Sequence, residues 1–482
     1  MNDAPKNARP GKKATAPKET PPPTSEASVD KQGKQIFVHH LTRVEGHGNI
    51  VVSIDHNDKI ETCRWEVPEA PRFFEAMVLG RSWRDIHHIT SRICGICSIG
   101  HQLASLQATE EALAIRPSEQ THVLRKLALH GENMQSHLLH LGYLVLPDLL
   151  NVDSVIPLAQ SHPKELKNLI ALHRLANEFS RVISGRTTHP QRLIPGGMGK
   201  LPTAEELKDI RKQLEDSVPK LKAAAELFAA LREKFPDFER PTEYVALVSE
   251  AEYPLYWGDI GSSHDKRKPA RFYMDTAKEY MVPHSTAKWA RNVKQSYMVG
   301  ALARYNLNHA MLHPLARKVA DQVGLTPMST NPYFNNLAQL VEVVHSVEDS
   351  IRHIDRLLTK GLKREPYPKV EPRAGKGVGA VEVPRGLLFH AYEYDDDGRI
   401  VRADCVIPTN QNHANIQHDL DELTPTISGK SEAEIELTLS MLVRAYDPCI
   451  SCSTHLIDMS GQEGGRGVRF VREPKAGESR KA

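Results

Sequence analysis

The sequence predicts an α+β fold that is mainly α-helical, with a large helical body and a small β portion. Three observations predict this class. From about residue 84 onward, apolar residues recur at helical spacing over long segments. Short alternating runs come before that point, between residues 35 and 67, and are typical of N-terminal β-strands. Residues 385–407, in the C-terminal half, form two alternating runs around Asp-Asp-Asp-Gly, which is the pattern of a β-hairpin.

Composition is that of an ordinary globular protein. The 482 residues are 40% hydrophobic and 25% charged, which is enough to bury a large core. A net charge of +2 gives no field that would attract nucleic acid or an anionic membrane. No stretch approaches the ~18 apolar residues of a membrane-spanning helix, and the polar N-terminus lacks the apolar segment of a secretory signal. Six cysteines in so long a chain argue against a disulfide scaffold and for a reducing compartment.

The expected elements can be placed in chain order. Residues 1–33 are rich in Pro, Lys, Ala and Thr, so we expect a disordered extension. Strands are expected at 35–40, 49–55 and 59–67, with a turn at 56–58. Helices are expected at 117–143, 163–184, 203–235, 285–323 (broken or kinked at Pro314), 331–362 and 432–445. We expect one compact domain over residues 34–455, then a polar tail at 456–482 that adds little to folding.

Four of the six cysteines form two C-x-x-C pairs at opposite ends of the chain. Cys94 and Cys97 lie in SRICGICSIGH, and Cys449 and Cys452 lie in DPCISCSTH. Thiolates at this spacing can clamp one metal, so both chain ends would have to converge on a buried metal site. Spacing alone leaves open a zinc ion on four sulfurs, two unrelated turns, or a thiolate-bound redox metal. Structural zinc pairs usually lie about 15–20 residues apart, far closer than these, which slightly favours the redox metal.

The residues around the cysteines carry a family resemblance. Five motifs occur in order: RVEGH at 43–47, RICGICSIGH at 92–101, GRTTHPQRLIPGGMGK at 185–200, GVGAVEVPRG at 377–386 and DPCISCSTH at 447–455. Together they resemble the large, catalytic subunit of the nickel–iron hydrogenases over about residues 41–455. Within that family the CGICSIGH string and the lack of a membrane helix resemble the soluble cytoplasmic group. The alternative location is export with a small subunit that carries a twin-arginine signal.

The resemblance implies a metal centre and a reaction. Cys94 and Cys449 would bind nickel terminally, while Cys97 and Cys452 would bridge nickel to an iron that carries carbon monoxide and cyanide. The reaction would be the reversible, heterolytic cleavage of H₂ to protons and electrons. Either the Cys449 sulfur or Arg385 would take the first proton.

Three residues would surround the diatomic ligands or the metals. Arg385 carries a planar cationic fork that can face anionic cyanide and stand over the open metal position. By motif match, Pro384 would pack on the diatomic ligands and Thr409 would donate a hydrogen bond to one of them. Without the motif, Arg385 would be interpreted as a surface residue at the start of the hairpin.

Two further residues would serve proton transfer and the sulfurs. Glu45 would carry protons outward, because burial can raise the pKa of a carboxyl group into a useful range. His101 follows Cys97 by four residues, so on a helix its ring could tune a bridging sulfur. Without the motifs, Glu45 would be a solvated acid in a Gly-rich turn and His101 a structural histidine.

Magnesium is the second implied cofactor. Glu75 resembles the family position that helps to hold this ion, and His455 would be the C-terminal ligand. The backbone carbonyl of Cys405 would be a third ligand. Taken alone, Glu75 would be an acid on a helix surface.

A histidine-rich stretch lies at 122–140. Its members are His122, His130, His137 and His140. On a helix, 130 and 137 share a face, as do 137 and 140, so metal binding is one interpretation. Packed or surface histidines are the commoner outcome and are favoured here.

Electron transfer requires partners. Cys63 and Cys405 are isolated, so no set of cysteines remains to bind an iron–sulfur cluster. The resemblance implies an iron–sulfur small subunit, together with further electron-transfer subunits. It also implies nickel-insertion proteins and a maturation endopeptidase, which would cut between His455 and Leu456. The alternative for the tail is that it stays and covers a partner interface.

The sequence is also compatible with two rival functions. One is a related quinone-binding respiratory subunit, which shares the hydrogenase fold but lacks the cysteine pairs. The other is a zinc-stapled scaffold without enzymatic activity. Metal analysis separates these two from a hydrogenase subunit. A hydrogenase would contain nickel and iron, a quinone-binding subunit no metal, and a scaffold zinc.

Overall fold

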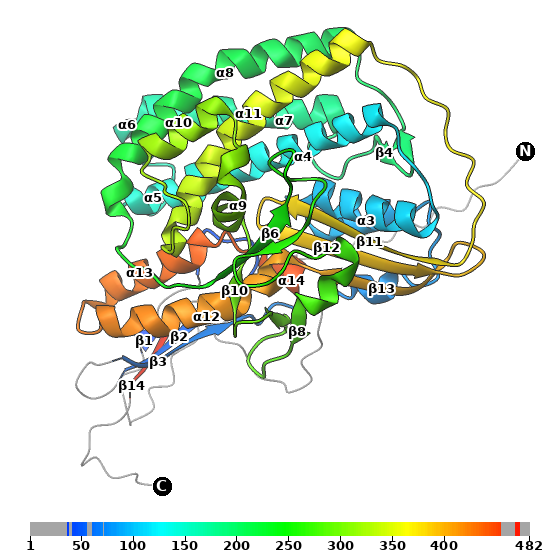
Figure 1. Ribbon diagram of the computed structural model, residues 1–482. Coiled ribbons are helices and arrows are strands. Elements are labelled where there is room, and N and C mark those ends of the chain that lie inside the picture. Colours follow the sequence, from blue (N-terminus) through cyan, green and yellow to red (C-terminus); the bar gives the residue numbers. More distant parts are fainter. Residues whose placement is uncertain (1–35, 38–40, 55–59, 71, 455–467, 473–482) are drawn as a thin grey trace, which may run out of the picture.

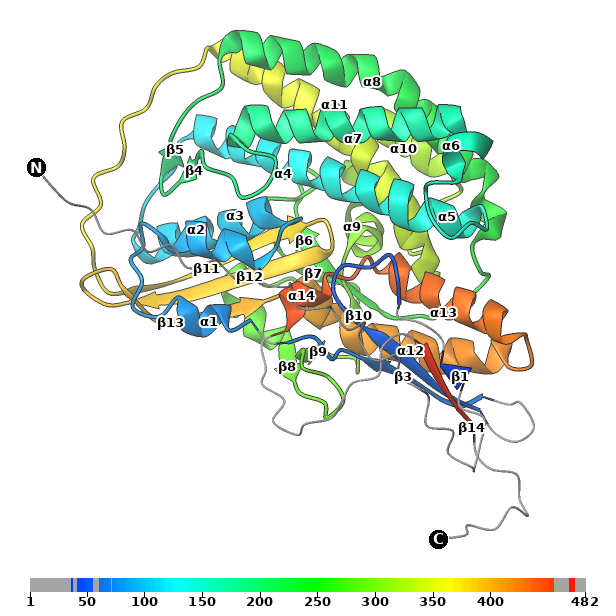
Figure 2. The same ribbon diagram turned by 180° about the vertical axis from the view of Figure 1, so that it is seen from behind.

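The computed structural model describes residues 36–37, 41–54, 60–70, 72–454 and 468–472. It shows a layer of long helices over a body in which small sheets and shorter helices mix (Figures 1 and 2). The predicted α+β class, mainly helical with a small β portion, is confirmed. Within the described ranges, no helix combines the length and apolar character needed to cross a membrane.

Helices dominate the middle of the chain, and strands lie towards both ends and around residues 243–298. The α-helices are α1 (Phe74–Met77), α2 (Ile86–Thr90), α3 (Ser98–Ala112), α4 (Glu119–Leu139), α5 (Leu146–Leu149), α6 (Leu158–Ser161), α7 (Pro163–Ser184), α8 (Ala204–Ala230), α9 (Ala301–Asn308), α10 (Pro314–Gln322), α11 (Asn335–Lys360), α12 (Pro408–Ile427), α13 (Glu432–Ala445) and α14 (Ile450–Ser453). The strands are β1 (Ile36–Phe37), β2 (Asn49–Ile54), β3 (Ile60–Glu66), β4 (Leu193–Ile194), β5 (Gly197–Met198), β6 (Glu243–Val248), β7 (Asp259–Ser262), β8 (Lys278–Tyr280), β9 (Trp289–Arg291), β10 (Tyr297–Met298), β11 (Gly375–Val383), β12 (Gly386–Tyr394), β13 (Ile400–Val406) and β14 (Val468–Arg472).

The helical layer consists of α4, α7, α8, α10 and α11 (Figure 1). Local capping fixes where several of these helices begin and end. Ser118 accepts a hydrogen bond from the Thr121 amide at the start of α4, and Thr203 and Glu206 form a capping box at the start of α8. α7 ends at Gly185, whose φ of 85° is readily adopted by glycine. The helices predicted at 163–184 and 432–445 have these bounds in the structure.

The body below is built around an antiparallel sheet of β11, β12 and β13, on which α3 packs. Gly375, Gly377 and Gly379 alternate along β11 on the side that faces α3. A Cβ atom at any of them would lie 1.9–2.3 Å from a backbone carbonyl oxygen of α3. The glycines therefore let helix and strand backbones touch. This packing fixes the middle and the end of α3 on the sheet, and the first cysteine pair precedes the start of this helix.

A second sheet contains the N-terminal strands and one strand from the tail. Its order is β1-β14-β2-β3, with β14 parallel to β2. The expected strands at 49–55 and 59–67 are confirmed. Of the strand expected at 35–40, residues 36–37 form β1. The turn at 56–58 lies outside the described residues. The expectation that the tail adds little to the fold is wrong for residues 468–472, because the alternating VRFVR run pairs with β2 on one side and β1 on the other.

The long helix expected at 285–323 is wrong in its first half. Residues 289–291 and 297–298 form β9 and β10, which pair with β8 and β6. The helix α9 begins only after Gly300, whose φ of 124° interrupts any helix. The predicted break at Pro314 is confirmed, since this residue starts α10. Periodicity also missed α12, whose polar first turns do not show an amphipathic pattern although they are buried.

Candidate metal centre

The two cysteine pairs meet in the core. Cys94 follows a short 3-10 turn, and Cys97 is the N-cap of α3. Cys449 is the N-cap of the one-turn helix α14, and Cys452 lies within that helix. Their four sulfur atoms all lie within 4.8 Å of one another, and all four side chains are buried. Cys449 Sγ is 3.5 Å from Cys94 Sγ and 2.7 Å from Cys452 Sγ. The expectation that both ends of the chain converge on one buried site is therefore confirmed.

Burial and mutual hydrogen bonds shift the pKa values of the thiols in opposite directions. Burial raises the pKa of the Cys452 thiol well above its usual value. At Cys94 burial acts in the same direction, but hydrogen bonds from the neighbouring thiols outweigh it and hold the pKa well below the usual value. The amides of Ile96 and Cys97 also donate to Cys94 Sγ, at 3.3 and 3.0 Å. Four clustered, buried soft donors are a ligand set for a thiolate-bound metal.

Arg385 lies close enough to the sulfurs for the charges of Cys94, Cys97 and Cys449 to act on it. It is buried, and its Nε and one terminal nitrogen donate to the carbonyl and carboxylate of Asp447, at 2.9 and 2.8 Å. The other terminal nitrogen donates to Ser136 Oγ at 3.0 Å. Burial lowers the pKa of the guanidinium, but Asp447 and the nearby cysteine thiolates raise it well above its usual value. The group is therefore a fixed cation against the metal site.

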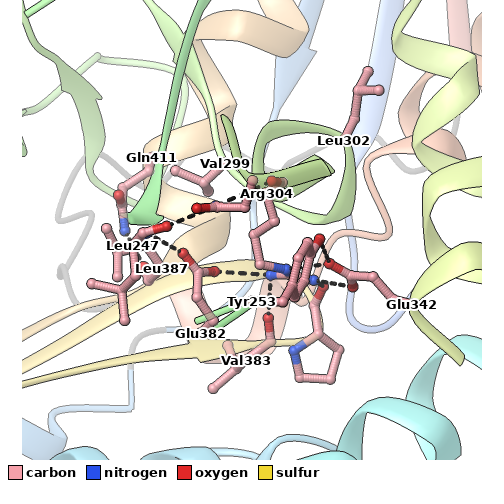
Figure 3. A network of polar contacts seen from close by, with 12 residues as sticks. Leu247, Tyr253, Val299, Leu302, Arg304, Glu342, Glu382, Val383, Leu387 and Gln411 are labelled. Carbon is pink, nitrogen blue, oxygen red and sulfur yellow. Dashed lines mark hydrogen bonds and ion pairs between the residues drawn. The ribbon is translucent and has the colours of Figure 1, made fainter. Parts of the chain in front are cut away.

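A second buried arginine holds the loop that carries Arg385 (Figure 3). Arg304, on α9, donates to the carbonyl oxygens of Val383 and Pro384 at 2.9 and 3.1 Å. It is also ion-paired with Glu342 of α11 at 2.6 Å and with Glu382 of β11 at 2.9 Å. Sequence reasoning missed Arg304, because no motif marks it and its partners are distant in the chain.

Thr409 and Pro384 lie on elements that carry or contact the site residues. Thr409 is buried at the start of α12, and its Oγ1 accepts a hydrogen bond from the Cys449 amide at 3.0 Å. The hydroxyl proton of Thr409 therefore remains to be donated to another group. Pro384 sits in the turn between β11 and β12, one residue before Arg385.

Glu45 contacts the C-terminal cysteine motif. Its carboxylate accepts hydrogen bonds from the hydroxyl and, at 3.2 Å, from the amide of Ser451. Its backbone carbonyl accepts from the Ile450 amide at 2.9 Å. The carboxylate is half-buried and is held against Ser451, which lies between Cys449 and Cys452 in the sequence.

His101 lies on α3 one turn after Cys97, as predicted, and its amide donates to the Cys97 carbonyl at 3.1 Å. Its Nδ1 is 3.0 Å from His390 Nε2. Its Nε2 is buried and has no hydrogen-bond partner among the described residues. Burial lowers the pKa of the ring to about 4, so it is neutral at pH 7.

Glu132 is a second residue that sequence reasoning missed. Its buried carboxyl group accepts hydrogen bonds from the amides of Ile99 at 2.7 Å and Gly100 at 3.1 Å, in the first turn of α3. Burial raises the pKa of Glu132 to about 8. One feature of the sequence could have indicated such a residue. Cys97, at the N-cap of α3, makes no side-chain capping hydrogen bond, so the first amides of α3 need an acceptor from another element.

The residues implied for magnesium are only partly described. Glu75 accepts a hydrogen bond from the amide of Cys405 at 2.9 Å, and burial raises its pKa. Lys288 lies 3.8 Å from Glu75 and 2.9 Å from Glu279, so two carboxylates share one ammonium group. His455 lies outside the described residues. A local excess of negative charge is compatible with a divalent cation.

The remaining cysteines and histidines have other surroundings. Cys63 and Cys405 are buried in separate sheets, and within the described part of the chain only one cysteine cluster occurs. His137 pairs with Glu342 at 2.8 Å, and His140 contacts Gln339 at 2.6 Å. His122 packs against aromatic rings.

Comparisons with known proteins agree with this site. The family model described as nickel-dependent hydrogenase matches residues 72–182 and 265–455, and a HoxL-like model matches residues 35–70. The chain is 33% identical over 423 residues to the alpha chain of sulfhydrogenase 1 from Pyrococcus furiosus, and the match covers 88% of this chain and 98% of that protein. It is 30% identical over 461 residues to one subunit of the vhc F420-non-reducing hydrogenase from Methanococcus voltae, with coverages of 88% and 95%.

A solved structure extends the comparison to the fold. The NAD⁺-reducing NiFe hydrogenase in its H₂-reduced state superposes with a TM-score of 0.78 at 25% identity, over 88% of this chain and 100% of that one. The family matches and the buried cluster of four cysteines argue against both a zinc-stapled scaffold and a quinone-binding subunit that lacks these cysteines. The chain therefore belongs to the nickel-dependent hydrogenase family and is its large, catalytic subunit, an oxidoreductase that cleaves H₂ at a nickel–iron centre.

Proposed function

We propose that Cys94 and Cys449 bind nickel terminally and that Cys97 and Cys452 bridge nickel to an iron carrying carbon monoxide and cyanide. The observation that carries this proposal is the convergence of four buried sulfurs beside one fixed, buried arginine. When bound, the metal pair supplies the position at which H₂ is split and the redox change that takes up its electrons. Soft thiolates suit such a pair, because they stabilise low-potential transition metals.

Metal analysis with infrared spectroscopy tests the proposal. Protein purified from a host that has the nickel-insertion machinery should carry about one nickel and about one iron per chain, with bands of metal-bound carbon monoxide and cyanide. The Cys452→Ala variant should lose both metals. Zinc at this site, with no such bands, would contradict the proposal.

Arg385, Pro384 and Thr409 are proposed to surround the iron ligands. The guanidinium of Arg385 offers a planar cation to anionic cyanide, and its fixed position lets it stand over the open metal position. Thr409 has a hydroxyl proton left to donate to a diatomic ligand. Pro384 contributes an apolar wall. The His101 ring is proposed to tune a bridging sulfur through its buried, unpartnered nitrogen.

Proton release is proposed to run from the Cys449 sulfur or Arg385 to Glu45. The contacts of Glu45 with Ser451 support this route, because they hold the half-buried carboxylate against the residue that lies between the two C-terminal cysteines in the sequence. A carboxylate in that position can accept a proton inside and release it outside.

A magnesium ion is proposed at Glu75, His455 and the backbone carbonyl of Cys405. The support is the pair of carboxylates that share the single ammonium group of Lys288. Glu75→Gln should lower the bound magnesium without changing the nickel content. Unchanged magnesium in that variant would contradict the proposal.

An iron–sulfur small subunit is the proposed electron acceptor, with further electron-transfer subunits behind it in a cytoplasmic complex. The support is that the described part of this chain holds no second cysteine cluster, while several relatives are named as subunits of hydrogenases. Co-purification followed by iron quantification tests it. Partner chains with additional iron and acid-labile sulfide are expected, whereas an active enzyme made of this chain alone would contradict it.

Maturation is proposed to cut the chain between His455 and Leu456, after nickel-insertion proteins have delivered the metal. Cleavage would release residues 456–482, including β14, and leave the edge of β2 to be covered in another way. The intact mass of active enzyme should show the loss of these residues. An active enzyme that still contains Ala482 would support the alternative, a tail that stays at a partner interface.

A further inference from the structure

A second group of metal-ligating side chains lies in the helical layer, away from the four cysteines. His130 is on α4, His313 precedes α10, and His345, Asp349 and His353 are on α11. His130, His345 and His353 are buried, and so is Asp349. The ion pairs of Asp349 are all made with this group and with Arg352, and none reaches the sulfurs or the Arg385 loop in the described part of the chain.

The two oxygens of Asp349 have different surroundings. Oδ2 is 2.8 Å from His130 Nε2 and 3.2 Å from His353 Nε2. The ligand atoms of these three residues all lie within 4.8 Å of one another. Oδ1 accepts hydrogen bonds from His313 Nε2 at 2.9 Å and from Arg352 at 2.6 Å, so this side of the carboxylate is anchored.

Helix geometry explains why the three residues meet. Asp349 and His353 are four residues apart on α11, so they share one face of the helix. α4 packs against that face and supplies His130. Two ligands at this spacing on one helix and a third from a neighbouring helix are a common way to build a metal site inside a helical layer.

The protonation states also fit a metal. Burial lowers the pKa of His130 below its usual value, so its imidazole is neutral at pH 7 and has a lone pair to offer. Burial raises the pKa of Asp349, but hydrogen bonds from three histidines outweigh this and hold it well below the usual range. The Nδ1 atoms of His130 and His353 are buried without a partner among the described residues. In the metal-free chain each Nε2 carries the proton that the ring donates to Asp349. On binding an ion, that proton would move to the unoccupied Nδ1 of the same ring, which leaves the Nε2 lone pair for the metal.

We propose that His130, Asp349 and His353 bind one divalent ion of the zinc type, with His313 and Arg352 orienting the carboxylate from its other side. Two imidazole nitrogens and one carboxylate oxygen select a borderline transition metal over magnesium or calcium, which prefer all-oxygen sites. Water would complete the coordination. The ion ties α4 to α11, the same two helices that bring His137 and Glu342 to the Arg304 network.

The test begins with the complete enzyme, nickel–iron centre included. After dialysis against a mild chelator and addition of Zn²⁺, metal analysis should find about one zinc per chain besides nickel and iron. X-ray absorption at the zinc edge should show only nitrogen and oxygen neighbours at about 2.0–2.1 Å. Sulfur neighbours at about 2.3 Å would place the zinc at cysteines and overturn the proposal. Absence of zinc would likewise overturn it, and the cluster would then be a hydrogen-bonded one.

Variants locate the ion without relying on activity. His353→Ala and Asp349→Asn should each weaken Zn²⁺ binding at least about tenfold in competition with a chromogenic chelator. His122→Ala, on the same helix as His130 but outside the cluster, should bind Zn²⁺ as the unaltered chain does. Unchanged binding in both cluster variants would overturn the proposal. If a cluster variant does not fold, the zinc-edge spectrum of the unaltered enzyme decides alone.

Discussion

Arg385 is held by three hydrogen bonds that fix the plane of its guanidinium beside the four sulfurs. Its neighbours differ in kind: Asp447 balances its charge, while Ser136 supplies only a neutral oxygen. A fixed, charged plane is a property that neither lysine nor a mobile arginine would provide. Arg385, Glu45 and Glu132 each depend on such a defined environment, and each can be tested by one substitution.

The Arg385→Lys substitution keeps a positive charge but loses the planar fork. We expect nickel and iron contents to be unchanged and H₂ oxidation to fall at least about tenfold, which corresponds to about 1.4 kcal/mol of activation free energy. Metal analysis and a dye-reduction assay on the same preparation check this. Near-normal oxidation in the fully metallated variant would show that the guanidinium is dispensable.

The Glu45→Gln substitution keeps the shape of the side chain and removes its ability to take up a proton. We expect turnover to fall at least about a hundredfold, the usual scale for removing a proton-transfer group, with metal content unchanged. Glu69→Gln is the matched control, because Glu69 is a nearby carboxylate that contacts His47 and not the cysteine motif. Equal activity of the two variants would argue against the Glu45 route.

Glu132 makes stability depend on pH. Its pKa is raised from 4.5 to about 8 by burial, so the folded state binds a proton that the unfolded chain has lost. The corresponding stabilisation is fully present below pH 4.5 and is lost as the pH rises through about 8. In the Glu132→Gln variant, the contribution of this group to the fall in unfolding free energy between pH 4.5 and about 8 should be absent. Thermal unfolding measured from about pH 5 to pH 9 checks it, and parallel curves for both proteins would contradict it.

At the scale of elements, two contacts position the metal site. The Arg304 network holds the turn between β11 and β12 (Figure 3). The glycines of β11 let α3 lie directly on the sheet. The first contact holds the turn that carries Arg385, and the second holds α3, which has Cys97 at its N-cap. Each can be broken by a single substitution.

Arg304→Met removes the partner of two buried carboxylates. Leaving buried charges unpaired usually costs about 3–5 kcal/mol, so the midpoint of denaturation should drop clearly. Arg211→Met on α8 is the matched control, since its ion pairs with Glu215 and Asp355 are partly exposed. We expect Arg211→Met to lower the free energy of unfolding by about 1 kcal/mol or less. Similar losses of stability in both variants would show that the Arg304 network stabilises the fold no more than a partly exposed ion pair does.

Gly377→Ala would place a Cβ atom 2.0 Å from the carbonyl oxygen of Ala108. Strand and helix would have to move apart, at a cost of about 1–3 kcal/mol, and metal loading should fall because α3 carries Cys97. Gly197→Ala is the control, because nothing lies within 4 Å of a Cβ atom there. The unfolding midpoint and the nickel content check both variants. A fully loaded, equally stable Gly377→Ala protein would contradict this role.

At the scale of the whole molecule, the metal site ties the two ends of the chain together. The Ile450 amide donates to the Glu45 carbonyl and the Arg72 amide donates to the Thr454 carbonyl, so backbone hydrogen bonds accompany the cysteine contacts. A metal on all four sulfurs binds only the folded arrangement and should stabilise it.

Removing the metal should therefore loosen the ends selectively. Protein made without nickel-insertion machinery should exchange the amide hydrogens of residues 42–50 and 446–454 at least about tenfold faster than the loaded enzyme. The helices α7 and α8 of the helical layer serve as an internal control and should exchange at the same rate in both proteins. Uniform change over the whole chain, or none, would contradict the prediction.

Local sequence was sufficient to predict the class of fold, the bounds of the helices at 163–184 and 432–445, and the two cysteine pairs that meet in the core. These features depend on local chemistry: periodicity, Pro and Gly at helix ends, and motifs in short windows. Cys94, Cys97, Cys449 and Cys452 could be recognised as one site because spacing and flanking residues mark them even though most of the chain separates the pairs.

The groups that support those residues emerged only from the packing of distant elements. Arg304, Glu132, Asp447 and Asp349 obtain their roles from partners on other elements, which no local window contains. The same holds for residues 285–300 and 468–472, whose strands exist because another strand offers an edge. Strand pairing and buried ion pairs gain their free energy from distant contacts, so they could not be predicted from the residues that make them.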